Sequence, residues 1–258
     1  MRISVVTVSM NAAATVGATL RSIAWQTQRP EHIVMDGRSR DATVETVHRL
    51  SPQSIVVSEP DRGLYDAMNK GVALATGDYV GFLNADDVYA RPDALQIVHD
   101  RLSRSGGDVL CGGVVMVRDT APERIVRRYG ATSFKPWQFR FGHMPPHPGV
   151  FVRRDLLLDA PFRTDLRIAS DYALLLKLSR RADLRWEMIE QTLVAMRIGG
   201  LSTGGLATNA RINREILGVL RETGLYANPV FIWSKYLAKI GQFVGRPADL
   251  AQGWRAAF

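Results

Sequence analysis

Short apolar runs alternate with helix-like segments along the first hundred residues. The runs have strand length and are rich in β-branched residues, whereas the segments between them repeat apolar residues at helical spacing. The predicted strands are residues 3–8, 33–35, 55–57 and 79–83, and the predicted helices are 14–26, 42–50, 64–75 and 92–102. Strands that alternate with helices favour a mostly parallel sheet with helices on both faces. We therefore expect an α/β fold.

Polar residues follow each of these predicted strands. The carboxyl ends of parallel strands share one edge of the sheet, and α/β proteins bind ligands in the crevice outside that edge. We therefore expect the polar residues to converge on one crevice. They are Ser9, Asn11, Asp36, Asp61, Arg62, Asn84, Asp86 and Asp87.

Asp86 and Asp87 directly follow an apolar run. Two carboxylates can hold a hard divalent cation, which also neutralises phosphates. Our hypothesis is a metal–nucleotide site, although an acidic pair after a strand is also ordinary loop or helix-cap chemistry. The chain contains neither G-x-G-x-x-G after its first strand nor G-x-x-x-x-G-K-[ST], so neither of those loops holds the nucleotide.

Composition indicates a globular protein with an anionic partner. Apolar residues make up 46% of the chain and charged residues 22%. The formal net charge is +8, but residues 1–99 hold nine Lys and Arg against eleven Asp and Glu, so the excess lies in the second half. A basic half suits phosphate, anionic lipid or nucleic acid. Cys111 is the only cysteine, which excludes an internal disulfide and fits a reducing cytosol.

The second half alternates less regularly. Residues 108–117, 149–152 and 193–196 are predicted strands, 125–141 is expected to be irregular, basic and aromatic, and 208–224 is a predicted helix. Residues 229–246 form an amphipathic stretch with aromatic and basic residues, which suits either a membrane surface or packing against the rest of the protein. The chain begins directly with a predicted strand and has no apolar run of membrane-spanning length, so we expect neither a signal peptide nor a membrane span.

Several motifs in combination resemble the family 2 glycosyltransferases with the GT-A fold, and most closely the bacterial exopolysaccharide and glycolipid transferases of the colanic-acid type. The resemblance covers roughly residues 1–205. The motifs are Ile3–Val8 with Asn11, Asp36-Gly37-x-Ser39-x-Asp41, Gly63-Leu64-Tyr65-Asp66-Ala67-Met68-Asn69-Lys70-Gly71, Phe82-Leu83-Asn84-Ala85-Asp86-Asp87, His147-Pro148-Gly149 and Ser170-Asp171-Tyr172.

The resemblance implies roles for individual residues. Asp86 and Asp87 would bind a divalent cation, Mn²⁺ or Mg²⁺, within a DxD-type element whose first position is Asn84. Asp36 would contact the nucleotide base near Thr7 and Ser9. Further residues would complete the donor site, with Lys70 within reach of a phosphate: Asn11, Asp61, Arg62, Asn69 and Lys70.

Asp171 matches the general base of inverting members of the family, because an acceptor hydroxyl is a poor nucleophile until a positioned carboxylate takes its proton. Its structural alternative is a first-turn acid on the following helix, favoured by the helix dipole. His147 and Arg197 are candidates on the acceptor side, and Arg197 could alternatively serve the donor diphosphate. His147 can equally be an ordinary loop histidine.

The resemblance thus predicts a GT-A domain over 1–205, with a nucleotide-sugar half (1–104) and an acceptor half (105–205), followed by a basic helical extension over 206–258. It would move a sugar from a UDP- or GDP-sugar to a hydroxyl of a glycan or lipid-linked acceptor, with inversion. The expected place is the cytoplasmic side of the cell membrane, in surface polysaccharide or glycolipid synthesis. The rivals are a sugar nucleotidyltransferase, which needs a triphosphate loop after the first strand, and a nucleotide- or nucleic-acid-binding module. We expect no nucleic acid, because the chain has no zinc-ligand spacing and no aromatic RNA-binding motif.

Overall fold

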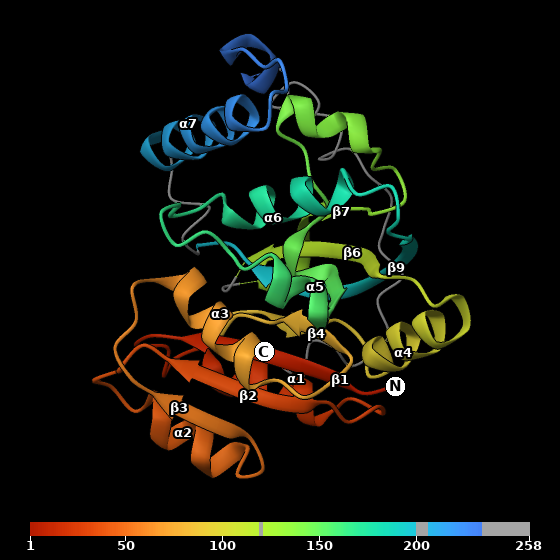
Figure 1. Ribbon diagram of the computed structural model, residues 1–258. Coiled ribbons are helices and arrows are strands. Elements are labelled where there is room, and N and C mark those ends of the chain that lie inside the picture. Colours follow the sequence, from red (N-terminus) through yellow and green to blue (C-terminus); the bar gives the residue numbers. More distant parts are fainter. Residues whose placement is uncertain (119–120, 200–205, 234–258) are drawn as a thin grey trace.

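The computed structural model describes residues 1–118, 121–199 and 206–233 of the chain. Its centre is a nine-stranded sheet in the order β3-β2-β1-β4-β8-β6-β9-β5, with β7 paired to β6 (Figure 1). The strands are β1 (Ile3–Ser9), β2 (Glu31–Asp36), β3 (Ile55–Ser58), β4 (Tyr79–Phe82), β5 (Val88–Tyr89), β6 (Val109–Arg118), β7 (Ala121–Tyr129), β8 (Val150–Arg153) and β9 (Trp186–Arg197).

The first four strands are parallel, as the alternation of strands and helices predicts. β1 lies between β2 and β4, and β3 forms the outer edge beside β2. Every residue of β1 is buried, because helices cover both faces of this part of the sheet. The α/β class is thereby confirmed.

The second half of the sheet is mixed rather than mostly parallel. β8 is antiparallel to β4 and β6, β7 is antiparallel to β6, and β5 is antiparallel to β9. Only β6 and β9 are parallel there. Strands joined without a helical crossover can reverse direction, and β6 and β7 are such a pair. The segment that we expected to be irregular, 125–141, thus begins inside β7 and continues into a 3₁₀ helix, η1 (Pro136–Phe141).

Helices cover both faces of the sheet. Residues of α1, α2 and α4 pack on one face, and residues of α3, α5 and α6 pack on the other face. The remaining short helix, η2, ends where β8 begins. The helices are α1 (Val16–Ala24), α2 (Thr43–Leu50), α3 (Leu64–Leu74), α4 (Ala94–Ser105), η2 (His147–Gly149), α5 (Arg154–Asp159), α6 (Ser170–Ser179) and α7 (Leu206–Glu222).

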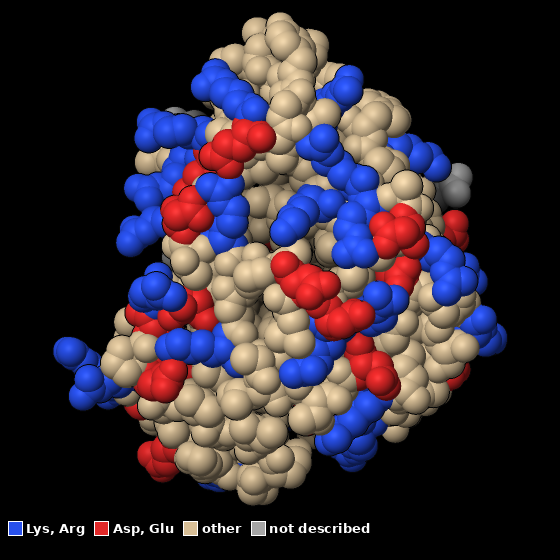
Figure 2. Space-filling view, in the orientation of Figure 1, with Lys and Arg blue, Asp and Glu red and all other residues tan. Residues whose placement is uncertain are grey.

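α7 docks on the rest of the molecule. Its residues Ile216, Val219 and Leu220 belong to the same core cluster as α6, and Figure 1 shows α7 lying over α6, away from β1–β3. Residues 229–233 are helical, whereas residues 234–246 of the predicted amphipathic stretch lie outside the described residues. In Figure 2, Lys and Arg gather over the part of this face formed by α5, α6 and α7, which fits the basic second half of the sequence.

Candidate active site

Asp36 joins the carboxyl ends of the first three strands. Its Oδ1 accepts hydrogen bonds from the hydroxyls of Ser9 (3.0 Å) and Ser39 (2.5 Å), and its Oδ2 accepts from the Ser39 N–H (2.8 Å) and the Ser58 hydroxyl (2.7 Å). The side chain is 2% exposed. Asp36 therefore organises this edge of the sheet through four protein donors. Ser39 and Ser58, which supply three of these donors, were not among the predicted site residues.

Asn11 ties the loop after β1 to the loop after β2. It has a left-handed backbone with φ of 50°, which Asn tolerates better than most residues. Its N–H donates to the Ser39 hydroxyl at 2.7 Å, and its side-chain oxygen accepts from the Arg40 N–H at 2.9 Å. Two polar loops are thus fixed side by side at the carboxyl edge.

Thr7 lies below this edge. It is fully buried, and its hydroxyl lies 3.0 Å from Nε2 of His32. Burial lowers the pKa of His32 to about 4, so this imidazole is neutral at physiological pH. The structure therefore does not bring Thr7 to the surface where Ser9 and Asn11 end.

Asp61 stands against the loop after β2. A Cβ added at Gly37 would lie 2.7 Å from Asp61 Oδ2, and Asp61 Oδ1 accepts from the Gly63 N–H at 2.8 Å. Asp61 can therefore lie close to the backbone of the loop after β2, because Gly37 carries no side chain.

Arg62 and Lys70 each form an ion pair with an acidic residue nearby in the sequence. Arg62 donates to Asp66 at 3.0 Å and is otherwise exposed. The Lys70 ammonium contacts Glu59 at 2.7 Å and the Pro60 carbonyl at 3.0 Å. Lys70 therefore secures the loop before α3 in this structure.

Asn69 is occupied by the main chain of a distant loop. Its amide donates to the Phe162 carbonyl at 2.8 Å, and its Oδ1 accepts from the Phe162 N–H at 2.9 Å. The pair joins α3 to the loop that precedes α6. Asn69 thus has a structural role here that its place in the motif did not reveal.

The acidic element lies directly after β4, where we predicted it. Asp86 is half-buried and Asp87 is 1% exposed. Asp87 accepts hydrogen bonds from the Arg197 N–H and from the Asn84 amide, which lies at 3.4 Å. β5 explains the arrangement, since it pairs with β9 and brings the end of that strand, Arg197, beside the two acids. Arg197 therefore lies beside Asp86 and Asp87.

The surroundings of Asp86 and Asp87 disfavour the ionised form of both carboxyl groups. Burial raises the pKa of Asp86, against the opposing effect of the Arg197 guanidinium. Burial and then the neighbouring charge of Asp86 raise the pKa of Asp87 well above its ordinary value. A cation beside the pair would favour the ionised form of both groups.

The donor atoms fit a divalent cation that a nucleotide completes. Within the described residues, no three His, Cys, Asp or Glu side chains gather as a metal cluster. The carboxamide oxygen of Asn84, however, is buried and has no hydrogen-bond partner in the described part of the chain. Mg²⁺ commonly takes one or two carboxylates and completes its shell with water and substrate phosphates. Asn84, Asp86 and Asp87 offer oxygen ligands of that kind.

Aromatic rings connect the end of β4 to α3 and α6. The ring of His147 stacks on Phe82 with centroids 5.3 Å apart and meets the edge of Phe162 at 5.7 Å. Phe162 in turn stacks on Tyr65 at 5.5 Å. His147 is 9% exposed and burial lowers its pKa to about 4, so it is a neutral member of this aromatic cluster (Tyr65, Phe82, His147 and Phe162).

Asp171 lies at the far end of the aromatic cluster, in the first turn of α6. The Tyr65 hydroxyl lies 2.5 Å from the Ile168 carbonyl and 3.3 Å from Asp171 Oδ1, which also accepts from the Tyr172 N–H at 2.8 Å. Burial raises the pKa of Asp171 to about 6, and the charge of Glu215 adds to this shift. A carboxyl with this pKa is ionised at neutral pH and can still accept a proton.

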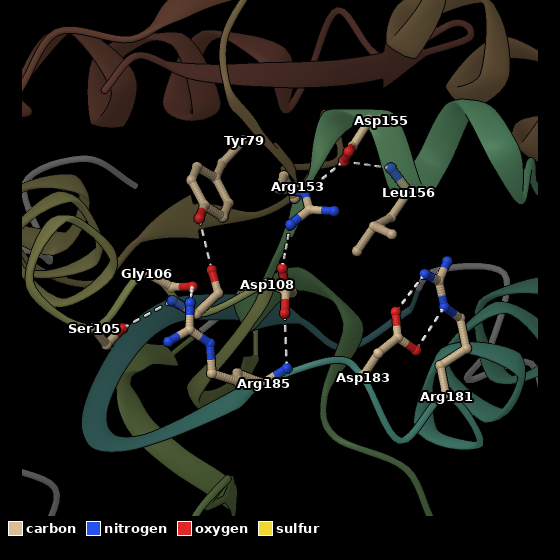
Figure 3. Close-up of polar contacts among 11 residues, drawn as sticks. Tyr79, Ser105, Gly106, Asp108, Arg153, Asp155, Leu156, Arg181, Asp183 and Arg185 are labelled. Carbon is tan, nitrogen blue, oxygen red and sulfur yellow. Dashed lines mark hydrogen bonds and ion pairs between the residues drawn. The ribbon is translucent and has the colours of Figure 1, made fainter.

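A second group of polar contacts lies at the opposite edge of the sheet. Asp108 accepts hydrogen bonds from the Arg153 side chain and from the Arg185 N–H at 2.7 Å, and Arg153 also pairs with Asp155 at 2.7 Å (Figure 3). A hollow of about 640 Å³ beside it is lined in part by Tyr79 and Arg153. Because Arg153 and Asp155 neutralise each other, we assign this hollow no ligand.

Comparison with known sequences decides the family. The sequence profile of Glycosyl transferase family 2 matches residues 4–157. The chain belongs to glycosyl transferase family 2. The matched segment holds the strand ends, the acidic element and His147 of this family 2 protein, whereas Asp171 lies beyond it.

Two of the relatives of the chain come from mycobacteria. An uncharacterized glycosyltransferase of Mycobacterium tuberculosis is 33% identical over 180 residues, which are 68% of each protein. A PGL/p-HBAD biosynthesis glycosyltransferase of Mycobacterium bovis is 33% identical over 175 residues, which are 66% of each. The chain thus spans about two thirds of the length of these relatives.

Solved structures share the fold. Residues 1–349 of TarS of Staphylococcus aureus, in complex with UDP-GlcNAc, superpose with a TM-score of 0.67 at 19% identity, covering 85% of this chain and 66% of that fragment. The mannosyltransferase PcManGT of Pyrobaculum calidifontis, in complex with GDP-Man and Mn²⁺, gives 0.61 at 18% identity and covers 99% and 71%. At these identities the similarity establishes the GT-A fold alone.

Proposed function

We propose that this protein transfers a sugar from a nucleoside-diphosphate sugar to an acceptor hydroxyl in a single displacement that inverts the anomeric centre. The observation that carries the proposal is the position of Asp171, a half-buried carboxyl group whose Oδ1 lies 3.3 Å from the hydroxyl of Tyr65 in the aromatic cluster. The aromatic cluster connects it to the end of β4, and the acidic element follows that strand. In our proposal Asp171 and the acidic element serve the same transfer site.

The donor nucleotide would bind across the ends of β1–β3. Asp61, Asn11 and the hydrogen-bonded group around Asp36 border this region, and their oxygens and N–H groups can recognise a base or a ribose. Arg62 is exposed at the same loop and can turn toward a phosphate. The solved neighbours include complexes with UDP-GlcNAc and with GDP-Man, so we propose a UDP- or GDP-sugar as donor.

Asn84, Asp86 and Asp87 would hold a divalent cation, with Asp86 the more accessible ligand because it is half-buried whereas Asp87 is buried. When bound, such a cation offsets the negative charge that develops on the leaving diphosphate. A neighbouring structure contains Mn²⁺, which supports this assignment. Arg197 adds a fixed positive charge beside the two acids.

Asp171 would take the proton of the attacking hydroxyl. The Tyr65 hydroxyl and the Tyr172 N–H hold the carboxylate in place at Oδ1. Its pKa of about 6 leaves it largely ionised above pH 7 and basic enough to accept the proton. The rings of His147 and Phe162 are buried between this base and the end of β4, so they support the site without contacting the sugar.

The acceptor would be a glycan or a lipid-linked sugar at an anionic membrane surface. The end of the molecule formed by η1 and residues 226–233 exposes Trp137 (61%), Tyr226 (70%) and Trp233 (60%). Phe141 of η1 stacks on Phe231 with centroids 5.2 Å apart, so the two segments form one apolar surface. Exposed Lys135 and Arg140 flank it, a combination that suits anionic lipid headgroups.

We propose a peripheral contact through this apolar surface. Among the described residues, no helix is long and apolar enough to cross a membrane. Flotation with vesicles of phosphatidylglycerol tests this point. We expect the chain to float with these vesicles but not with vesicles of neutral phosphatidylcholine. Trp137→Ser should weaken the association with phosphatidylglycerol. Absence of flotation, or formation of a dimer that buries the same surface, would contradict it.

The experiment that tests the proposed function measures diphosphate release from UDP- and GDP-sugars with MnCl₂ and alkyl glycosides as acceptors. We expect release from one donor class, and a fall in kcat of at least about a hundredfold in Asp171→Asn. Asp165→Asn, an acid of the preceding loop that pairs with Arg163, is the matched control and should retain activity. Release from no donor, or full activity of Asp171→Asn, would refute the proposal.

A further inference from the structure

α6 begins without a cap of its own. The residue before its first turn is Ala169, whose side chain cannot accept a hydrogen bond. The first N–H groups of a helix have no partner inside the helix and need one from elsewhere. Asp171 itself accepts from one of them, the Tyr172 N–H, so the position of Asp171 depends on the backbone that enters the turn, residues 167–169.

Glu215 of α7 binds the backbone that leads into this first turn. Its Oε2 accepts hydrogen bonds from the N–H groups of Ile168 (3.0 Å) and Ala169 (2.9 Å), and its Oε1 accepts from the N–H of Arg167 (3.2 Å). One carboxylate thus binds three successive backbone N–H groups. A negative charge at this end of the helix also interacts favourably with its dipole.

The same turn is held from its other side. The Tyr65 hydroxyl of α3 contacts the Ile168 carbonyl at 2.5 Å, while Glu215 binds the Ile168 N–H. The turn before Asp171 is therefore clamped between α3 and α7, two elements that are distant in sequence. Movement of Tyr65 or of Glu215 would therefore displace the Asp171 carboxylate.

We propose that Glu215 is a positioning residue of the transfer site, which acts on Asp171 through the three N–H groups of residues 167–169 and through its own negative charge. The inference rests on the proposed function, in which Asp171 is the base. It gives α7 a part in the reaction as well as in the fold.

The groups that face Asp171 come from three elements. Tyr65 approaches from α3, α6 itself offers the Tyr172 N–H, and Glu215 approaches from α7. Glu215 supplies the charge that favours the protonated form of Asp171, in addition to burial. Loss of this charge should therefore shift the titration of Asp171 toward lower pH.

The test compares Glu215→Gln with wild type in the pH profile of kcat/KM. We expect kcat to fall about tenfold or more, since displacement of a catalytic group is costly, with a smaller change in the KM of the donor. The acid limb of the profile should move to lower pH. Glu222→Gln is the matched control, because Glu222 is also on α7 and binds Arg163, on the loop before α6, and it should leave the acid limb unchanged.

An unchanged acid limb and unchanged kcat in Glu215→Gln would overturn the inference, as would equal effects in both variants. If Glu215→Gln does not fold, hydrogen exchange of the wild type decides, because the amides of Ile168 and Ala169 should be protected and rapid exchange would refute the contact. Failure of the proposed function gives a different result. Asp171→Asn would then remain active, whatever the activity of Glu215→Gln.

Discussion

Replacement of Asp171 by Asn should stabilise the protein while it removes activity. Burial raises the pKa of Asp171 from 3.8 to about 6, so the folded state disfavours the carboxylate that is present at neutral pH. A shift of this size corresponds to roughly 3 kcal/mol at about 1.36 kcal/mol per pKa unit. An Asn side chain keeps the Oδ1 acceptor but brings an amide donor, whose burial without a partner costs about 1 kcal/mol. The net gain is about 2 kcal/mol.

The gain depends on pH in a defined direction. Because the pKa in the folded state lies above that of the unfolded chain, the stability contributed by Asp171 is fully present below pH 3.8 and is lost as pH rises through about 6. Asn does not titrate, so the advantage of Asp171→Asn should be near zero at pH 4 and complete above pH 7. Activity and stability thus oppose each other at this residue.

Thermal unfolding of both proteins between pH 4 and pH 8 measures this effect. For a chain of this size we expect Tm to rise by about 4 °C or more at pH 8. Asp165→Asn is the control of opposite sign, because the hydrogen bonds from Arg163 lower the pKa of Asp165 and its replacement should not stabilise. An Asp171→Asn variant that is equal to or less stable than wild type at pH 8 would refute the account of this site.

Three further changes test the donor edge and its support. Gly37→Ala should weaken diphosphate binding about tenfold by calorimetry, because its Cβ would lie 2.7 Å from Asp61 Oδ2 and displace that side chain. Gly130→Ala is the control, because a Cβ there meets nothing within 4 Å, and it should leave the affinity unchanged. Equal affinity in both variants would contradict the role of Asp61. Asp36→Ala should lower the free energy of unfolding in urea by at least about 3 kcal/mol, because it deprives four donors of their acceptor; a loss below about 1 kcal/mol would count against the network. Asn69→Ala should cost about 2 kcal/mol in the same assay through the two Phe162 contacts, and an unchanged midpoint would disprove their contribution.

The regular first half could be predicted from the sequence because its pattern is local. Buried parallel strands are continuous β-branched runs, and β1, β2, β3 and β4 lie within two residues of their predicted bounds. The second half was harder because β7 carries charged residues. Arg127 is buried there with its guanidinium 4.1 Å from the centroid of the Tyr129 ring, and a buried arginine interrupts the alternation by which strands are recognised.

The site could be predicted only in part, because its residues find partners far away in the chain. The position of Asp86 and Asp87 after β4 follows from the motif, but the approach of Arg197 depends on the pairing of β5 with β9. Asn69 stands in a family motif, yet its partner Phe162 could not be identified from spacing. Glu215 gave no local signal at all, since its three partners precede it by more than forty residues.

Titration calorimetry of UDP and GDP with Mn²⁺, on wild type and on Asp86→Asn, tests the central claim most directly. Asn keeps the shape of the side chain and removes the charge that a cation needs. Our account predicts that one diphosphate binds wild type more tightly with Mn²⁺ than without it, and that Asp86→Asn loses this dependence. Absence of binding by both diphosphates, or the same affinity with and without Mn²⁺ in both proteins, would contradict a metal-dependent donor site at the end of β4.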